Sequence, residues 1–220
     1  MPTVTLDPAA TPREIEARSF AIIDAEIPEP CPFSGALWQV ARRCVHTLGD
    51  TDIIADLRLS RQGLEAGVAA LSRGCVVYTD TRMAAAGLPA RRMKPLGVTV
   101  TPLLALPGLE RAARLGNSTL ARAAVESVVA RQSGGLAGAV IAIGNAPTAL
   151  LALLEALEGG ALPPALIVGM PVGFVNAAQS KELLNRSPWP HFTLLGRKGG
   201  SAVAAACVNA LAELALGLRN

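Results

Sequence analysis

His46 is the residue of this chain best suited to move protons. It lies in residues 43–50 (RCVHTLGD), at the polar end of an amphipathic, helix-like stretch, and is one of two histidines. An imidazole changes charge near neutral pH, so it can donate a proton and take it back. A lone histidine at a helix end can equally be a cap or a surface residue. Its chemistry therefore depends on the segments that the fold places beside it.

The residues near His46 leave its partners open. Asp50 and Asp52 follow it closely and can be either catalytic or simply solvated carboxylates around a helix end. The chain has no GxSxG elbow and no HExxH motif, which argues against serine or metal-dependent hydrolysis. Two histidines, His46 and His191, are too few for a histidine-rich metal site, and we expect no bound metal.

Four glycine-containing or polar segments each follow an apolar run: residues 79–83 (TDTRM), 144–148 (GNAPT), 169–175 (GMPVGFV) and 196–201 (GRKGGS). GNAPT can bring backbone N–H groups close to an anion, or it can be an ordinary strand-to-helix turn. GMPVGFV is typical of a pocket lining. GRKGGS resembles a phosphate cradle but does not match GxxxxGK[ST], so a nucleotide site has weak support.

The elements needed to position these segments follow from hydrophobic periodicity. Nearly continuous apolar runs predict buried parallel strands at 75–80, 97–102, 138–145, 165–171 and 191–196. Helical segments are predicted at 12–26, 37–46, 107–131 with a break near Gly116, 147–158 and 201–218.

This alternation predicts a three-layer α/β/α sandwich around a mainly parallel sheet of about five strands, with a helical N-terminal segment. We expect one domain over residues 1–220. Ligands bind beyond the carboxyl ends of the strands in such sheets, where the four segments gather.

Composition narrows the class of protein. Hydrophobic residues make up 51% of the chain and charged residues 17%, which suits a large core. No apolar run reaches the ~20 residues of a membrane span, and residues 1–16 lack the pattern of a signal peptide. We therefore expect a cytoplasmic protein that does not contact a membrane.

Charge and cysteine content narrow the ligand class. Cys31, Cys44, Cys75 and Cys207 form no CxxC pair, so reduced thiols are expected. The net charge of +3 comes without a basic cluster interleaved with aromatic residues, so nucleic acid is not an expected partner. A mildly basic, arginine-rich chain suits a small polyanionic ligand.

Taken together, several segments resemble one family, the precorrin-8X methylmutases, which include the cobalt-precorrin-8 enzymes. The matching pieces are residues 19–23 (SFAII) with Glu26, 43–46 (RCVH), 80–83 (DTRM) with Gly87, 144–150 (GNAPTAL), 169–175 (GMPVGFV) with 180–181 (SK), and 196–201 followed by 209–211 (NAL). They span nearly the whole chain in the family's order.

The resemblance implies a flavodoxin-like fold and a homodimer with active sites near its interface. The implied reaction moves a methyl group from ring carbon 11 to ring carbon 12 of a tetrapyrrole, precorrin-8X or its cobalt form, and gives hydrogenobyrinic or cobyrinic acid. No external cofactor is implied. Contacts with other enzymes of the corrin pathway stay open.

The resemblance also implies roles for individual residues, with His46 as the catalytic proton donor and acceptor. The residues expected to bind substrate are Ser19, Arg43, Thr47, Asp80, Arg82, Met83, Asn145, Ala146, Pro147, Thr148, Pro171, Val172, Gly173, Ser180 and Lys181. Arg43 and His46 are three positions apart, so the spacing places both on one helical face.

One departure from the family pattern concerns residues 116–120 (GNSTL), where Thr119 stands in place of an expected arginine. Arg122, one turn later, can substitute, or the contact is lost. This departure keeps open a second reading, a non-catalytic tetrapyrrole-binding or carrier protein. A nucleotide-binding protein of flavodoxin-like fold is a third, weakened by the missing phosphate motif. Arg43 and His46 favour the enzyme, because a carrier needs no proton donor.

Overall fold

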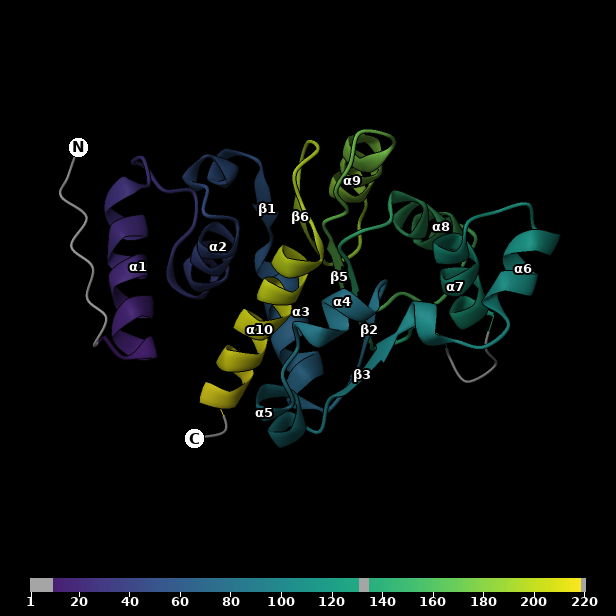
Figure 1. Ribbon diagram of the computed structural model, residues 1–220, viewed down its shortest axis with the longest axis horizontal. Helices are drawn as coiled ribbons and strands as arrows, with labels where there is room; N and C mark the ends of the chain where they lie inside the picture. The colour runs from purple at the N-terminus through teal and green to yellow at the C-terminus, as the bar shows by residue number, and fades with distance from the viewer. Residues whose placement is uncertain (1–9, 131–134, 219–220) are drawn as a thin grey trace.

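Six strands form one sheet in the computed structural model, which describes residues 10–130 and 135–218 (Figure 1). The strands are β1 (Leu57–Leu59), β2 (Val76–Thr79), β3 (Thr99–Pro102), β4 (Val140–Ile143), β5 (Leu166–Gly169) and β6 (His191–Leu194). Their order across the sheet is β1-β6-β5-β4-β2-β3. Strands β2 to β6 are parallel and correspond to the five apolar runs in the sequence.

Strand β1 corrects the expected number of strands from about five to six. It forms the edge of the sheet and pairs antiparallel with β6, with Leu57 opposite Leu194. Its sequence is only Leu-Arg-Leu, too short for periodicity to reveal. The five parallel strands by themselves have the doubly wound order of flavodoxin-like folds, which confirms the predicted fold class. The order reverses between β2 and β4, where such folds bind ligands.

Ten α-helices and three 3-10 helices are found among the described residues. The α-helices are α1 (Pro12–Glu26), α2 (Gly35–Leu48), α3 (Arg61–Ser72), α4 (Arg82–Ala86), α5 (Ala90–Met93), α6 (Leu109–Leu115), α7 (Leu120–Val129), α8 (Pro147–Glu158), α9 (Ala177–Arg186) and α10 (Ser201–Gly217). The 3-10 helices are η1 (Thr51–Ala55), η2 (Lys94–Leu96) and η3 (Leu103–Ala105).

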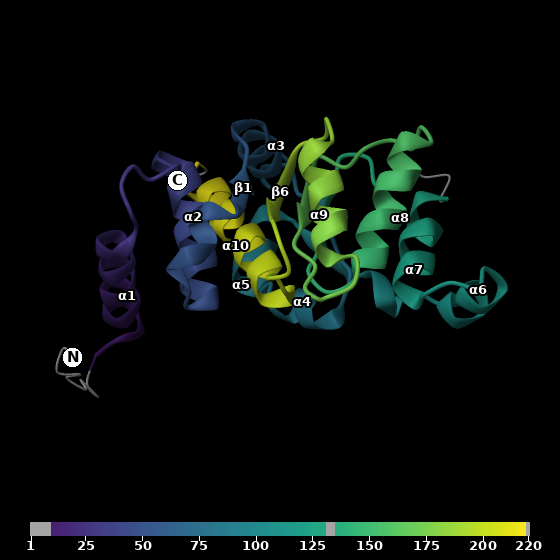
Figure 2. The ribbon, with the colours of Figure 1, turned by 90° about the horizontal axis from the view of Figure 1, so that it is seen from above.

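The helical predictions are confirmed for α1, α2, α8 and α10, and for the broken segment that becomes α6 and α7. Arg131, the last residue of that predicted segment, lies outside the described residues. Helices α3, α4, α5 and α9 were not predicted. Views along two directions place α1 and α6 at opposite ends of the molecule (Figures 1 and 2).

Two hydrophobic cores, one on each face of the sheet, make the fold three-layered. Along β4, Val140 and Ala142 belong to the core formed with α2, α3 and α10. Ile141 and Ile143 belong to the core formed with α7 and α8. The alternation follows from the two-residue period of a strand, and all four side chains are fully buried. Among the described residues, no helix is long and apolar enough to cross a membrane.

The end of β4 meets the start of α10 at Gly144, which brings the carboxyl edge of the sheet to that helix. A Cβ added at Gly144 would lie 2.6 Å from the Ser201 Cα and 2.7 Å from the Gly200 carbonyl oxygen. Both neighbours are backbone atoms, so no change of a neighbouring side-chain rotamer can make room for a Cβ at Gly144. The loop after β2 also contacts the start of α10, because the Thr81 and Ser201 hydroxyls share a hydrogen bond of 3.0 Å.

Gly144→Ala should lower the free energy of unfolding by about 1–3 kcal/mol, the usual cost of overpacking. Gly217→Ala is the matched control, because a Cβ there meets nothing within 4 Å. The control should be neutral or stabilise by up to about 1 kcal/mol, since alanine favours helix over glycine. Denaturant titrations of both variants measure the difference. Equal stability of the two variants would contradict the close approach of β4 to α10.

Candidate active site

His46 lies in the last turn of α2 with its side chain exposed to solvent. The helix ends directly afterwards because Gly49 adopts a left-handed conformation (φ 60°) and its N–H donates to the Val45 carbonyl oxygen at 2.9 Å. Cys44 and Val45 face the core. The opposite face of α2 therefore carries the polar side chains, as the spacing of Arg43 and His46 predicts.

Phe20 of α1 packs against the polar face of α2. Its ring makes an edge-on contact with the imidazole of His46, with ring centroids 5.4 Å apart and planes at 74°. The guanidinium carbon atoms of Arg42 and Arg43 lie 4.3 and 5.0 Å from the Phe20 ring centroid. Cation–π contacts of this kind stabilise the arginines in place. One aromatic side chain thus orients the imidazole and two neighbouring cations.

His46 borders two hollows. The first, which we call the arginine pocket, has a volume of about 250 Å³ and is lined by Arg43, His46, Thr47, Gly87, Arg92, Ala202, Ala205, Ala206 and Asn209. The second, the α1 pocket, has a volume of about 280 Å³ and is lined by Ser19, Ile22, Ile23, Glu26, Val45, His46, Gly49, Asp50 and Thr51. Each is smaller than the roughly 300–1,000 Å³ of a drug-sized ligand site. Each therefore suits one substituent of a larger ligand that lies over His46.

Two arginines and two glutamates form a network at the arginine pocket. Arg43 donates to Glu213 on α10, with 2.9 Å between Nη2 and Oε2, and also pairs with Glu16 on α1. Arg92 on α5 pairs with the other oxygen of Glu213. The hydrogen bond from Arg43 lowers the pKa of Glu16. The network joins four helices and places two guanidinium groups beside His46.

Asp80 follows β2 and is almost fully buried. Its Oδ2 accepts hydrogen bonds from the backbone N–H groups of Asn145 (2.6 Å) and Ala146 (3.0 Å). The carboxylate therefore shapes the turn between β4 and α8, on the ligand-binding edge at the reversal point of the sheet. In this arrangement Asp80 supports the 144–148 turn, whereas the Asn145 side chain itself is exposed.

Several expected substrate residues form an exposed apolar rim at the strand ends. Met83 is 75% exposed, Val172 43%, and Phe174, which was not among the expected residues, 85%. The Arg197 guanidinium carbon lies 5.1 Å from the centroid of the Phe174 ring. Met83 lies at the start of α4 and Val172 and Phe174 in the loop after β5, all at the carboxyl edge of the sheet, where such folds bind ligands. Arg82 is exposed beside Met83, while Pro171 is buried under the loop.

Thr119, which stands where an arginine was expected, makes contacts inside the protein. Thr119 caps α7 by accepting from the Arg122 N–H, and its hydroxyl shares a hydrogen bond of 2.9 Å with that of Thr148. Arg122 pairs with Glu126 (2.8 Å) and Glu155 on the neighbouring helix. Arg122 is thus engaged between α7 and α8. Pro147 and Thr148, at the start of α8, are half-buried.

Ser180 and Lys181 lie inside the molecule, away from any ligand surface. Both have no exposed area. The Ser180 hydroxyl donates to the Ala177 carbonyl oxygen at 3.0 Å, and Lys181 Nζ donates to the Lys198 carbonyl oxygen at 2.6 Å. The expectation that these two side chains contact substrate directly does not agree with their burial.

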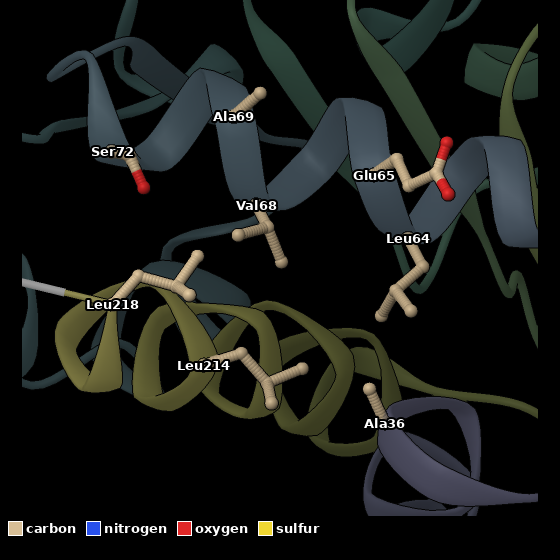
Figure 3. Close-up of a pocket in the computed structure, with 8 residues that line it drawn as sticks. All are labelled: Ala36, Leu64, Glu65, Val68, Ala69, Ser72, Leu214 and Leu218. Atoms are coloured by element: carbon tan, nitrogen blue, oxygen red, sulfur yellow. The ribbon is translucent and has the colours of Figure 1, made fainter.

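A third, mainly apolar groove of about 420 Å³ runs between α3 and α10 (Figure 3). It reaches Ala36 at the start of α2, ten residues or about 15 Å of helix before His46. Figure 3 shows that its polar atoms come from Glu65 and Ser72, so it carries no arrangement for acid–base chemistry. The surface around His46 combines an imidazole with two guanidinium groups, and it is therefore the candidate active site.

Sequence reasoning missed five residues of this site: Glu16, Phe20, Arg92, Asn209 and Glu213. Phe20 and Asn209 lie within segments that carry the resemblance, but no role was expected for either side chain. Arg92 belongs to the short helix α5, which periodicity cannot detect. Glu16 and Glu213 find their partner across 27 and 170 positions of the chain. Only the fold brings them together.

Comparison with known proteins gives one consistent family. The precorrin-8X methylmutase (CbiC) family model matches residues 14–214. The chain is 43% identical over 200 residues to the precorrin-8X methylmutase of Pseudomonas aeruginosa, covering 90% of this chain and 93% of that protein. It is 41% identical over 207 residues to the cobalt-precorrin-8 methylmutase of Salmonella typhimurium, covering 91% and 94%.

A solved structure agrees with this result. The precorrin-8X methylmutase from Thermus thermophilus superposes with a TM-score of 0.84 and 43% identity, covering 93% of this chain and 97% of that one. Similarity of sequence and fold over nearly the full length confirms the resemblance seen in the motifs. The chain therefore belongs to the precorrin-8X methylmutase family, a family of isomerases of cobalamin biosynthesis.

Proposed function

We propose that this protein isomerises precorrin-8X, or its cobalt form, by moving a methyl group from ring carbon 11 to ring carbon 12. The product is hydrogenobyrinic acid or cobyrinic acid. The observation that carries this proposal is the position of His46, an exposed imidazole shared by the arginine pocket and the α1 pocket. A macrocycle lying over His46 can send one peripheral arm into each hollow.

The proton chemistry follows from that position. Protonation of a ring nitrogen or an adjacent carbon lowers the barrier to methyl migration. His46 as imidazolium gives that proton, the methyl group moves with its bonding electrons to the neighbouring ring carbon, and the proton then returns to the imidazole. Nothing is gained or lost overall, as an isomerisation requires. Phe20 restricts the imidazole ring through its edge-on contact.

Recognition of the substrate rests on its carboxylate arms and its apolar ring. Arg43 and Arg92 present N–H donors in the arginine pocket, and a guanidinium has five donors, more than Glu213 uses. Ser19 and Asp50 supply polar groups in the α1 pocket. The remaining contacts proposed for the substrate are made by Thr47, Arg82, Met83, Asn145, Ala146, Pro147, Thr148, Pro171, Val172 and Gly173.

The proposal includes a single domain, a homodimer and a cytoplasmic location. The exposed apolar rim at Met83 and Phe174 supports burial against a ligand or a second subunit. A non-catalytic tetrapyrrole carrier is the second candidate, because Thr119 replaces an expected arginine. The exposed position of His46 between two hollows favours the enzyme, since a carrier needs no proton donor.

His46→Ala should abolish most turnover, with a rate loss of about 10²–10⁴-fold, the usual contribution of a general acid–base. Binding should change little, because affinity comes from the arginines and the pocket walls. The visible spectrum of precorrin-8X, followed during incubation with wild type and variant, measures turnover. Fluorescence quenching on the same samples measures binding.

His191→Ala is the matched control for this experiment. His191 begins strand β6, where its Nδ1 is 2.8 Å from the Trp189 carbonyl oxygen, and it lines neither hollow. Its removal should leave turnover near the wild-type rate. Normal turnover by His46→Ala would refute the proton role, and tight binding without turnover by the wild type would favour the carrier.

Arg92→Ala should weaken tetrapyrrole binding by roughly 1.5–3 kcal/mol, the net value of a hydrogen bond to a charged group. Turnover by saturated enzyme should change far less, and the salt dependence of affinity should become shallower. Titrations at low and high salt measure both effects. Arg186→Ala, an exposed arginine on α9, is the control. Unchanged affinity of Arg92→Ala at low salt would show that the arginine pocket does not hold a carboxylate.

A further inference from the structure

The turn between β6 and α10, residues 196–200, is fixed to the loop that follows β5. The Gly200 N–H donates to the Met170 carbonyl oxygen at 2.9 Å, and the Gly173 N–H donates to the Arg197 carbonyl oxygen at 3.2 Å. The two segments approach so closely at Gly199 that an added Cβ would lie 2.3 Å from the Met170 carbonyl oxygen. We call residues 196–200 the glycine turn. These contacts join it to residues 170–173.

Lys181 holds the glycine turn from inside the molecule. Its side chain has no exposed area, and its Nζ donates to the Lys198 carbonyl oxygen at 2.6 Å. Burying an ammonium group is costly unless it is paired and hydrogen-bonded. Burial lowers the pKa of Lys181 to about 8, against an opposing effect of Asp56. A fully buried ammonium group needs a hydrogen-bond partner, and Lys181 finds it in the backbone of the glycine turn.

Lys198 extends from the glycine turn in the other direction, toward His46. Its Nζ lies 2.5 Å from Oδ2 of Asp50, four residues after His46. Asp50 lines the α1 pocket together with His46 and Gly49, and its Oδ1 accepts from the Asp52 N–H at 3.0 Å. The same residue of the turn is thus held by Lys181 through its carbonyl oxygen and holds Asp50 through its ammonium group.

We propose that Lys181 and Lys198 are positioning residues that set the distance between His46 and the apolar rim through the glycine turn. The inference rests on the proposed function, because it assigns the two lysines to the same reaction. A displacement of about 1 Å at a reacting group can cost two orders of magnitude in rate. The Lys198–Asp50 pair is largely exposed, with 55% and 28% of the side chains accessible, so it adds little to stability. Its effect should therefore appear in catalysis.

Lys198→Met tests the pair between Lys198 and Asp50, because it keeps the length of the side chain and removes the charge. We expect kcat to fall roughly 10- to 100-fold while KM and the melting temperature stay close to wild type. Lys198→Arg should restore most of the rate, since it can pair with Asp50. Combining Lys198→Met with Asp50→Asn should add little to either single change, because both remove one interaction.

The matched control is Lys94→Met, which removes an exposed lysine on η2, outside both hollows. It should leave kcat at the wild-type value. Lys181→Met tests the hydrogen bond from Lys181 to the Lys198 carbonyl oxygen, because methionine cannot make it. It should produce the same split between kcat and KM, together with faster amide hydrogen exchange across the glycine turn.

Amide hydrogen exchange of residues 45–52, measured without substrate, tests the positioning role independently of the reaction. Lys198→Met should accelerate exchange there by up to about fivefold through local opening, and Lys198→Arg and Lys94→Met should not. A wild type without methylmutase activity would refute the proposed function, while the exchange data would still decide the link between the turn and His46. Unchanged exchange at 45–52, or a lower melting temperature with normal kcat, would overturn the positioning role.

Discussion

The close packing of α10 against α2 is the contact on which the site depends. At this crossing the Cys44 and Cys207 sulfur atoms lie 3.3 Å apart, and both side chains are fully buried. Helix α10 is rich in alanine and is buried over most of its length, so it approaches α2 closely and cannot accept larger side chains without strain. Because Cys44 faces this crossing, Arg43 and His46 emerge at its edge, beside Asn209 of α10. The geometry of the site is thus a consequence of core packing.

The ion pairs determine the charge of the site, whereas the packing of α10 against α2 determines where the site lies. Arg43, Arg92, Glu16 and Glu213 are all partly exposed, and such pairs contribute only about 0–1 kcal/mol each. A single buried aliphatic side chain contributes about 1.5–3 kcal/mol. The two glutamates balance the two arginines, so an incoming carboxylate must share guanidinium groups that are already engaged. Such an arrangement favours a ligand that carries several carboxylates at once over a single small anion, in line with a tetrapyrrole.

Sequence patterns predicted five strands and six of the helices, and missed the short elements together with two amphipathic helices, α3 and α9. Five buried strands and the long helices follow from apolar runs, whereas the three-residue β1 and the short α5 carry too few residues for a pattern. The spacing of Arg43 and His46 was enough to place both on one face. The partners of Arg43 were not predictable, because Glu16 and Glu213 meet it only in the folded chain. Lys181 was expected to bind substrate, but its burial was not predictable, since a lysine is rarely buried and nothing local signals it.

Thr119 stands where the resemblance led us to expect an arginine, and its contacts bear on how substrate would be oriented. The Thr119 and Thr148 hydroxyls bond to each other, and Arg122 pairs with Glu155 across α7 and α8. A carboxylate arm that reached this region would meet hydroxyl and backbone N–H donors in place of a free guanidinium. Bidentate guanidinium contacts are the stronger of the two. Under the proposed function, the substrate is therefore held most firmly at the arginine pocket, which is also the edge beside His46. The same anchoring that provides affinity would then fix the reacting part of the macrocycle next to its proton donor.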